Sequence, residues 1–393
     1  MKKIYLDYNA TTPLDPRVLD EMLPYLRDGF GNPSSIHSFG MRGKSALDRA
    51  REQVAALINA EPREIVFTSG GSEGNNYAIK GVASADRRKK GNHLVTTRVE
   101  HESVLEAFRF LERDGFRVTY LGVDASGTID LDELRDSISE ETLLVSCIFA
   151  NNETGTVMPI AEIARIVKEK GAVFHTDAVQ AVGKVDIDMA EIPADLLTLS
   201  AHKFYGPKGA GALYIRDGIN KKVGLRPLIH GGGQERGSRS GTENVPGIAG
   251  MGMASEISLR EMKEDERRIR PLRDRLWESL SASIAGIRLN GDMDGLLWNT
   301  LNVFIDGVSG DSLSMALDLE GVAVSTGSAC SEGKVDPSHV LLAMGLTRAD
   351  ASYSVRLSLG RFTRDGEIDA AAVIVPRAVE RIREARGGSS AAL

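Results

Sequence analysis

Short apolar runs alternate with amphipathic stretches between residues 64 and 215. The runs are EIVFTSG, HLVTTRVEH, LLVSCIFANN, AVFHTDA, DLLTLSAHK and GALYI. They are apolar throughout, which is typical of parallel strands that helices cover on both faces. The stretches between them, such as IAEIARIVKEKG, repeat apolar residues with a helical period and end at a glycine. The alternation predicts an α/β domain with a largely parallel sheet.

From about Gly247 to Ser283 the pattern becomes helical and highly charged. Pro271 lies inside this stretch, and a proline in a helix interior costs about 3 kcal/mol because it removes a backbone hydrogen bond. We therefore expect a kink or a break near Arg270, and a domain boundary close to it. The apolar segments TLNVFID and SVRLSLGRF beyond this point, with helices between them, predict a smaller α+β domain.

The composition favours an ordinary globular protein and argues against nucleic-acid-binding, disulfide-rich and membrane proteins. A chain of 393 residues suits two domains, and 42% hydrophobic with 26% charged residues is ordinary for a globular protein. The net charge of −7 argues against a nucleic-acid partner. Two cysteines exclude a disulfide framework and favour the reducing cytoplasm. We find no signal peptide and no run of the roughly 18–20 apolar residues that a membrane helix needs, so we expect no membrane partner.

Candidate site residues, most of them polar, follow five of the six apolar runs, all except GALYI. Because ligands of open α/β sheets bind at the carboxyl ends of the strands, five neighbouring strands would deliver these side chains to one composite site. The residues concerned are Gly70, Gly71, Ser72, His101, Asn151, Asn152, Asp177, Gln180, Ser200, His202 and Lys203.

The segment TSGGSEGNN joins a strand to a helix through glycines. Backbone N–H groups and the helix dipole at such a turn suit an anion such as phosphate. The segment lacks the Walker lysine and the GxGxxG spacing, so a nucleotide loop is not indicated. An ordinary strand-to-helix turn remains the alternative.

Lys203 lies at a strand end beside Ser200 and His202, where partial burial would release its proton and make the amine a nucleophile. An amine nucleophile next to a phosphate cradle suggests pyridoxal phosphate held as a Schiff base. That cofactor needs an acid partner for its pyridinium nitrogen, a role that suits Asp177, although Asp177 could instead cap a helix. His101 could stack on the ring or move protons, or be structural.

Ten segments, in order from Tyr5 to Phe362, carry a family resemblance. They resemble the cysteine desulfurases of the NifS/IscS class: YLDYNATTP, FGNPSSIHSFG, FTSGGSEGNN, VEHESVL, NNETG, HTDAVQAVGK, SAHKFYGPKGAGALY, GGGQERGSRSGTENV, STGSACSEG and VRLSLGRF. The resemblance covers nearly the whole chain. It implies a pyridoxal-phosphate enzyme of fold type I, usually a homodimer, with a mainly parallel seven-stranded sheet in a large domain. That domain would comprise residues 15–262, and a smaller α+β domain would comprise residues 1–14 and 263–393.

The resemblance also implies a role for each site residue. Lys203 would bind the cofactor and move the α-proton, Asp177 would pair with the ring nitrogen, and Gln180 would contact the ring hydroxyl. The full cofactor-binding set is Gly71, Ser72, His101, Asn152, Asp177, Gln180, Ser200, His202, Lys203 and Thr242, with Thr242 reaching the phosphate of the partner subunit.

The substrate carboxylate would be held by Asn152 and Arg356. A guanidinium suits this role because its planar fork bonds a carboxylate bidentately, and the alternative for Arg356 is a surface salt bridge.

Cys330 lies in STGSACSEG, where glycine and serine on both sides predict a long loop. By the resemblance, the catalytic residues are Cys330, Lys203 and His101. The Cys330 thiolate would take the sulfur of L-cysteine as a persulfide, L-alanine would leave, and the sulfur would pass to an acceptor such as an iron–sulfur scaffold protein. Cys147, inside an apolar run, is expected to be an inert core residue. No histidine spacing indicates a metal site, so we expect no metal.

Four readings remain for the function. The first is an L-cysteine desulfurase, and the second is a selenocysteine lyase or another fold-type-I pyridoxal-phosphate enzyme. A Cys–His hydrolase that uses Cys330 would leave Lys203 without a role. A non-catalytic relative would not need to keep Lys203, Asp177, His101 and Cys330 together.

Overall fold

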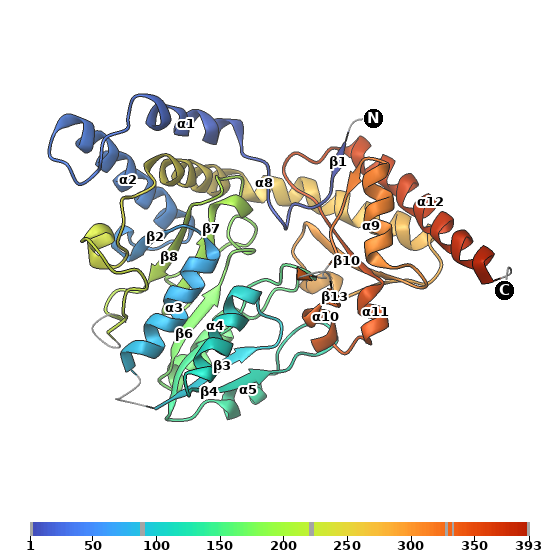
Figure 1. Ribbon diagram of the computed structural model, residues 1–393, viewed down its shortest axis with the longest axis horizontal. Helices are drawn as coiled ribbons and strands as arrows, with labels where there is room; N and C mark the ends of the chain where they lie inside the picture. The colour runs from blue at the N-terminus through green and yellow to red at the C-terminus, as the bar shows by residue number, and fades with distance from the viewer. Residues whose placement is uncertain (1–2, 87–90, 220–223, 327–328, 332–333, 391–393) are drawn as a thin grey trace.

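The computed structural model of the chain describes residues 3–86, 91–219, 224–326, 329–331 and 334–390. Figure 1 shows a larger part, built on a sheet with helices around it, and a smaller part that holds both termini. No helix of the described residues combines the length and apolar character needed to cross a membrane.

The larger part is built on a seven-stranded sheet in the order β2-β8-β7-β6-β5-β3-β4. Its strands are β2 (Ile65–Thr68), β3 (His93–Thr97), β4 (Arg117–Leu121), β5 (Thr142–Ser146), β6 (Val173–Asp177), β7 (Leu196–Ser200) and β8 (Gly211–Ile215). All run parallel except β8, which pairs antiparallel with both β2 and β7. The prediction of a mainly parallel seven-stranded sheet is confirmed.

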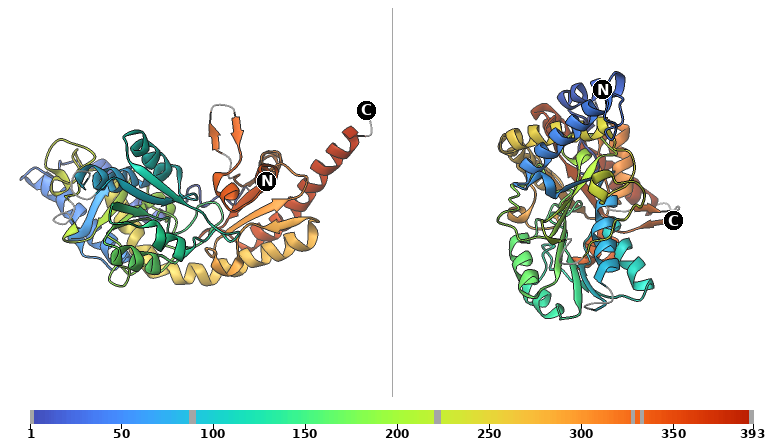
Figure 2. Two further views of the ribbon diagram at one scale, coloured as in Figure 1. Left: turned by 90° about the horizontal axis from the view of Figure 1, so that it is seen from below. Right: turned by 90° about the vertical axis from the view of Figure 1, so that its left-hand side faces the viewer.

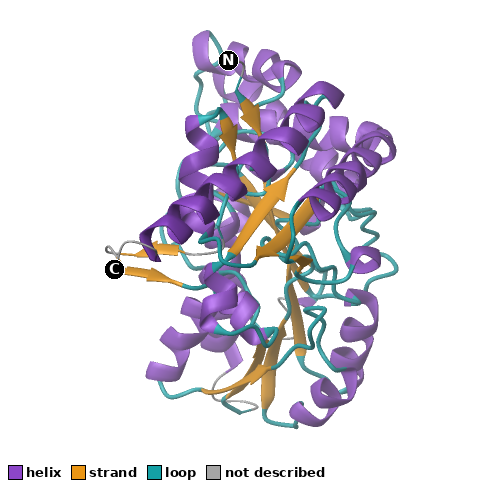
Figure 3. Cartoon of the chain, turned by 90° about the vertical axis from the view of Figure 1, so that its right-hand side faces the viewer, coloured by secondary structure: helices purple, strands orange, loops and turns teal. Residues whose placement is uncertain are grey.

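Helices cover both faces of this sheet (Figure 3). Successive strand residues point to opposite faces, so Leu144 packs in one hydrophobic cluster and Val145 in the other. Helices α3 and α4 supply residues to the first cluster, and helices α1, α2, α6 and α8 supply residues to the second. The helices of this part are α1 (Pro16–Arg27), α2 (Ser38–Leu57), α3 (Gly71–Asp86), α4 (Glu102–Arg113), α5 (Leu131–Ser137), α6 (Ile160–Glu169) and the start of α8 (Val245–Ser283).

The smaller part contains an antiparallel three-stranded sheet in the order β14-β10-β9 and a parallel pair, β1 with β11. Its core joins the first residues of the chain, such as Leu6, to residues from Ile269 onward. The elements are β1 (Ile4–Tyr5), β9 (Ile287–Leu289), β10 (Thr300–Ile305), α9 (Gly310–Leu319), β11 (Val322–Ala323), α10 (His339–Ala343), α11 (Arg348–Ser352), β14 (Ser354–Ser358) and α12 (Asp365–Ser390). The division at residues 14 and 262 stays a prediction.

The break expected near Arg270 is absent, because α8 continues through Pro271 as one helix of 39 residues. Proline removes the hydrogen bond to the carbonyl four residues earlier, which belongs to Arg267. Pro271 and Arg267 are both exposed, so water can satisfy that carbonyl. The buried residues Ile269, Leu272 and Leu276 hold this part of α8 against the smaller core. Tertiary packing therefore outweighs the local cost of the proline.

The Cys330 segment forms more regular backbone structure than the expected loop. Strands β12 (Ala329–Ser331) and β13 (Lys334–Asp336) pair antiparallel, with Cys330 opposite Val335. Figure 2 shows this hairpin standing out from the surrounding elements. The Cys330 side chain lies outside the described residues, so its predicted position stays a prediction.

Gly211 at the start of β8 allows the sheet to meet the glycine turn before α3. It pairs with Thr68 on one side and Ser200 on the other, and a Cβ there would lie 2.6 Å from the Gly70 Cα. Gly211→Ala should therefore lower the free energy of unfolding by about 1–3 kcal/mol, because backbone must move to admit the methyl group. Urea unfolding of the cofactor-free protein measures this.

Gly122→Ala is the control for this prediction, since a Cβ at Gly122 meets no atom within 4 Å. It should change the unfolding free energy by less than about 0.5 kcal/mol. Equal stabilities of the Gly211 and Gly122 variants would show that the Gly70 backbone yields without cost.

Candidate active site

A cavity of about 400 Å³ lies at the carboxyl ends of β6 and β7, as the strand-end argument predicts. It brings together residues from β6, β7, α3, α4 and the smaller part. The predicted residues that line it are Gly71, Ser72, His101, Asn152, Asp177, Gln180, Ser200, His202, Lys203 and Arg356. Their roles stay predictions, but their placement around one cavity is a property of the fold.

Lys203 ends a short 3₁₀ helix, Ala201–Lys203, that directly follows β7. Its Nζ donates to the carbonyl oxygens of Asn9 at 2.6 Å and Ala10 at 2.8 Å. Burial, and then the positive charge of Arg356, lower the pKa of Lys203 to about 8. Roughly a tenth of the amine is then neutral at pH 7, against roughly one part in 2,500 for an unperturbed lysine. This amine is suited to nucleophilic attack on a carbonyl.

The turn after Lys203 is held in a strained conformation. Tyr205 has a φ of 68°, which is uncommon for a residue with a side chain. Its backbone N–H donates to Thr12 Oγ1 at 2.8 Å, and its hydroxyl accepts the Arg361 N–H at 2.6 Å. The Arg361 guanidinium also lies 4.4 Å from the centre of the Tyr205 ring. Strain of this kind persists because the surroundings fix it, and these contacts fix the turn that follows Lys203.

Asp177 is the last residue of β6 and its carboxylate is buried. One carboxylate oxygen accepts the Asn75 amide at 2.6 Å and the other accepts the backbone N–H of Val179 at 2.9 Å. Asn75 also donates to Ser103 Oγ at 2.9 Å, so α3 and α4 both position the acid. The carboxylate can therefore receive a positively charged or N–H donor from the cavity.

The start of α3 forms a narrow wall of the cavity. The helix begins at Gly71, and a Cβ there would lie 2.8 Å from Val179 Cγ2. Ser72 and Ser200 also line this wall. Backbone close to the cavity, together with the positive end of the helix dipole, suits an anion.

His202 also lines the cavity, and its imidazole ring is uncharged at neutral pH. Burial, and then the positive charges of Lys203, Lys208 and Lys184, lower its pKa to about 4. Its Nδ1 lies 3.1 Å from Thr11 Oγ1. At neutral pH the ring is a hydrogen-bonding group without charge.

His101 caps the start of α4, which is the structural role left open from the sequence. Its Nδ1 accepts the Ser103 N–H at 3.1 Å. Because Nδ1 accepts, the neutral ring carries its proton on Nε2. The same residue lines the cavity, so the structural and the functional roles are compatible.

Arg356 is not a surface salt bridge. It lies in β14, buried, where one terminal nitrogen donates to Asp7 Oδ1 at 2.7 Å and the other to the Asn152 carbonyl at 2.8 Å. Its Nε is buried without a hydrogen-bond partner among the described residues. The guanidinium thus faces the cavity with donor capacity left for an anionic ligand.

Several residues of the cavity were not predicted from the sequence. Asn9, Asn75 and Ser103 line the cavity, and Asp7 holds Arg356. Asn151 does not line it; its side chain instead accepts the backbone N–H groups of the following turn. The family resemblance could have indicated them, because they lie in YLDYNATTP, FTSGGSEGNN and VEHESVL, three of the segments that carry it.

Thr242 lies apart from the cavity. It is exposed and borders a separate hollow of about 150 Å³ with Ser69, Gly209 and Arg239.

Cys147 is buried, and burial raises the pKa of its thiol well above the usual value, so the prediction of a core cysteine is confirmed.

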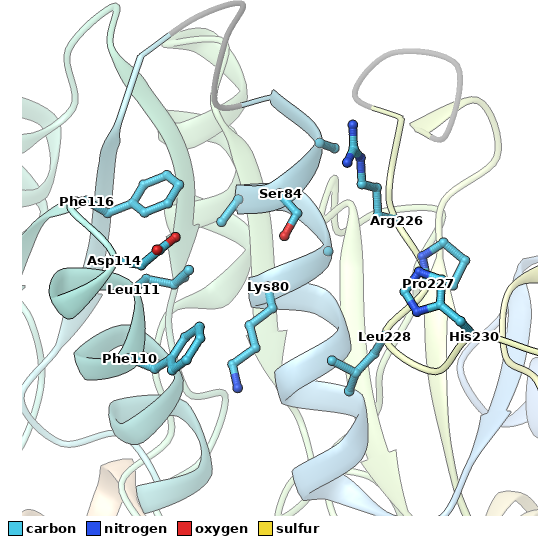
Figure 4. Close-up of a pocket in the computed structure, with 13 residues that line it drawn as sticks. Lys80, Ser84, Phe110, Leu111, Asp114, Phe116, Arg226, Pro227, Leu228 and His230 are labelled. Atoms are coloured by element: carbon cyan, nitrogen blue, oxygen red, sulfur yellow. The ribbon is translucent and has the colours of Figure 1, made fainter.

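Cavity size alone does not locate the site. A larger hollow of about 750 Å³ lies between α3, the end of α4 and residues 226–230 (Figure 4). None of the predicted site residues lines it, and its Lys80 ammonium stacks over the Phe110 ring at 4.4 Å. Of these two cavities, the smaller one gathers an amine, a buried acid and a guanidinium.

Comparisons with known proteins agree with the resemblance. A cysteine desulfurase IscS of Clostridium botulinum is 49% identical over 98% of this chain and 96% of its own length. A cysteine desulfurase of Trichormus azollae is 49% identical over 98% of this chain and 94% of its own length. The solved structure of a NifS-like protein superposes with a TM-score of 0.89 at 40% identity, covering 97% of this chain and 99% of the other.

A second NifS-like structure, from Rickettsia africae, has a TM-score of 0.86 at 32% identity and covers 97% of this chain and 99% of that one. The family model described as aminotransferase class-V matches residues 4–371, which include both parts of the fold and every residue of the cavity. Full-length agreement in sequence and in backbone leaves one assignment: the chain belongs to the aminotransferase class-V family, among the relatives of the NifS and IscS cysteine desulfurases.

Proposed function

We propose that this protein is a pyridoxal-phosphate-dependent L-cysteine desulfurase. It converts L-cysteine to L-alanine and transfers the sulfur to Cys330 as a persulfide. The observation that carries the proposal is the single cavity in which a partly deprotonated Lys203, a buried Asp177 and an anion-binding helix start face one another. A solved structure with a TM-score of 0.80, titled SspA in complex with cysteine, supports the choice of substrate class.

The residues of the cavity fit pyridoxal phosphate. Its phosphate would lie at the start of α3, where Gly71, Ser72 and Ser200 line the cavity. Its ring nitrogen would meet Asp177, and its aldehyde carbon would meet the Lys203 amine. Two buried polar atoms without partners among the described residues, Asn75 Oδ1 and Arg356 Nε, mark capacity for a further polar ligand. The wider cofactor set comprises Ser72, His101, Asn152, Gln180, Ser200, His202 and, from the partner subunit, Thr242.

When bound, the cofactor supplies an electron sink for carbanion chemistry at the substrate α-carbon. Lys203 supplies a base at Nζ for the α-proton, since part of its amine is neutral near pH 7. Arg356 and Asn152 orient the substrate carboxylate, and His101 can move a proton at Nε2. Asp177, held by Asn75, presents its carboxylate to the cavity for the ring nitrogen.

Sulfur transfer balances without an added oxidant or reductant. The Cys330 thiolate forms an S–S bond with the substrate sulfur while the substrate C–S bond breaks. The C–S bonding pair stays on carbon, and a proton completes the methyl group of alanine. The net reaction is L-cysteine plus the Cys330 thiol giving L-alanine plus the Cys330 persulfide.

We further propose a homodimer in the cytoplasm that passes sulfur to an acceptor protein for iron–sulfur cluster assembly. The dimer is supported by Thr242, which is exposed and distant from the cavity of its own chain, as a residue serving a partner subunit would be. The hairpin that carries Cys330 stands out from the fold, which suits delivery to another protein.

Cofactor capture should follow the depressed pKa of Lys203. Below pH 8 the neutral amine fraction rises about tenfold per pH unit, and above it the fraction levels off. The initial rate of chromophore formation, when cofactor-free protein is mixed with pyridoxal phosphate, should therefore rise between pH 6.5 and 8 and plateau by pH 9. A rate that still climbs between pH 9 and 10.5 would indicate an ordinary, solvated lysine.

The competing function, a selenocysteine lyase, is tested by substrate preference. Alanine formed from L-cysteine and from L-selenocysteine gives kcat/KM for each, measured with the same cofactor-loaded protein. A desulfurase turns over L-cysteine at a rate within about 100-fold of L-selenocysteine. Turnover of L-selenocysteine with L-cysteine inert would replace the proposal by the lyase.

A further inference from the structure

A second buried lysine lies behind the cavity. Lys184 follows a tight turn at Gly183, whose φ is 77° and whose added Cβ would lie 2.8 Å from Phe204 Cβ. Phe204 is the residue after Lys203, so this turn packs directly against the backbone that carries the cavity amine. The Lys184 carbonyl accepts the indole N–H of Trp298 at 2.8 Å, which fixes the turn from the smaller part.

The Lys184 amine has unusual partners for a buried charge. Its Nζ donates to the Gln180 backbone carbonyl at 3.0 Å and to the Gln180 side-chain oxygen at 3.2 Å. Among the described residues no carboxylate pairs with it within 4.0 Å. Burial, and then the charge of Lys203, lower the pKa of Lys184 to about 7. A buried amine without a counter-ion is costly, so its retention calls for a role.

That amine and the Asn9 carbonyl together determine which way the Gln180 amide faces. The two ends of a glutamine amide have nearly the same shape, so hydrogen-bond partners decide its orientation. Lys184 donates and therefore selects the oxygen, while the Asn9 carbonyl accepts and selects the nitrogen at 2.8 Å. The amide nitrogen has two N–H groups, and Asn9 uses one of them. The other is left for the cavity that Gln180 lines.

We propose that Lys184 is a positioning residue that makes Gln180 a hydrogen-bond donor to the ring hydroxyl oxygen of the cofactor. Without Lys184 only the Asn9 carbonyl holds the orientation of the amide. In the turned orientation the amide oxygen faces an oxygen of the cofactor. Protonated Lys184, four residues after Gln180, also favours an anionic ligand oxygen over a hydroxyl that donates. The inference rests on the proposed function, because it concerns the cofactor of that same cavity.

Lys184→Met tests the proposal, since methionine fills similar space without a donor. Loss of one oriented hydrogen bond should raise the dissociation constant of pyridoxal phosphate about tenfold. An analogue of pyridoxal phosphate that lacks the ring hydroxyl should bind both proteins within about twofold. Lys184→Arg, which keeps a donor, should restore most of the affinity for the complete cofactor.

A double-mutant cycle separates positioning from packing. In the Gln180→Met background, Lys184→Met should have no further effect on the dissociation constant, because its target is gone. Thermal unfolding of the cofactor-free variants reports any purely structural cost. If Lys184→Met does not fold, Lys184→Gln enters the same cycle, where its shorter side chain should give a smaller loss.

Two outcomes would overturn the inference. One is an unchanged dissociation constant in folded Lys184→Met; the other is an equal loss with the analogue that lacks the hydroxyl. Failure of the proposed function looks different, because wild-type protein would then bind no pyridoxal phosphate or release no alanine. The two failures are therefore distinguishable in one set of measurements.

Discussion

Lys203→Ala abolishes alanine formation from L-cysteine, with a loss of about 10⁴-fold or more, because one amine serves two steps. In the proposed function it binds the cofactor carbonyl, and it then serves as the base for the substrate α-proton. Both steps need the neutral amine, and burial supplies it by lowering the pKa of Lys203 to about 8. The nearby Lys184 amine cannot replace it, since Lys184 is turned toward Gln180.

Borohydride reduction followed by peptide mapping measures the first role of Lys203 directly. The wild-type protein should carry the reduced cofactor on the peptide that contains Lys203, and the variant should carry none. Lys168→Ala, an exposed position on α6, serves as the control and should keep full activity. A Lys203 variant that retains more than a tenth of wild-type turnover would remove this lysine from the mechanism.

Cys330→Ala should lower alanine formation from L-cysteine at least about 100-fold and should leave no protein-bound persulfide. Without an acceptor thiol, the substrate C–S bond has no nucleophile to take its sulfur. Mass spectrometry of the peptide that spans Cys330, after a single turnover of wild-type protein, should find one additional sulfur there.

Cys147→Ala is the matched control for the Cys330 variant, because it removes the other cysteine of the chain. Cys147 is buried and its pKa is raised, so it cannot supply a thiolate, and the control should keep its persulfide on Cys330. Equal alanine from wild type and from Cys330→Ala would contradict the account and would favour selenocysteine as the substrate.

The sheet could be predicted from the sequence because each of its buried strands is a short, continuous apolar run. Runs such as LLVSC are apolar on both faces, and the structure shows why: Leu144 and Val145 pack into different hydrophobic clusters. The rule that ligands bind at the carboxyl ends of parallel strands predicts Asp177 and Lys203 at one edge, and both line the same cavity.

Other features depended on contacts between distant residues. Asp7 reaches Arg356 across 349 positions, and no local pattern marks that pair. Pro271 was expected to interrupt a helix, yet its exposure and the packing of Ile269 and Leu272 leave α8 intact. The serine and glycine residues around Cys330 predicted a loop, whereas Cys330 pairs with Val335 in a hairpin. Tertiary packing outweighed the local preference at Pro271, whereas the hairpin pairs residues that are only five positions apart.

The most direct measurement is L-alanine released from L-cysteine by the protein loaded with pyridoxal phosphate, in the presence of a reducing thiol that removes the persulfide. The account predicts many equivalents of alanine per chain from wild type, and almost none from Cys330→Ala or Lys203→Ala. No alanine from a wild-type protein that demonstrably carries the cofactor on Lys203 would contradict the account, and the cavity would then serve another reaction of the same cofactor.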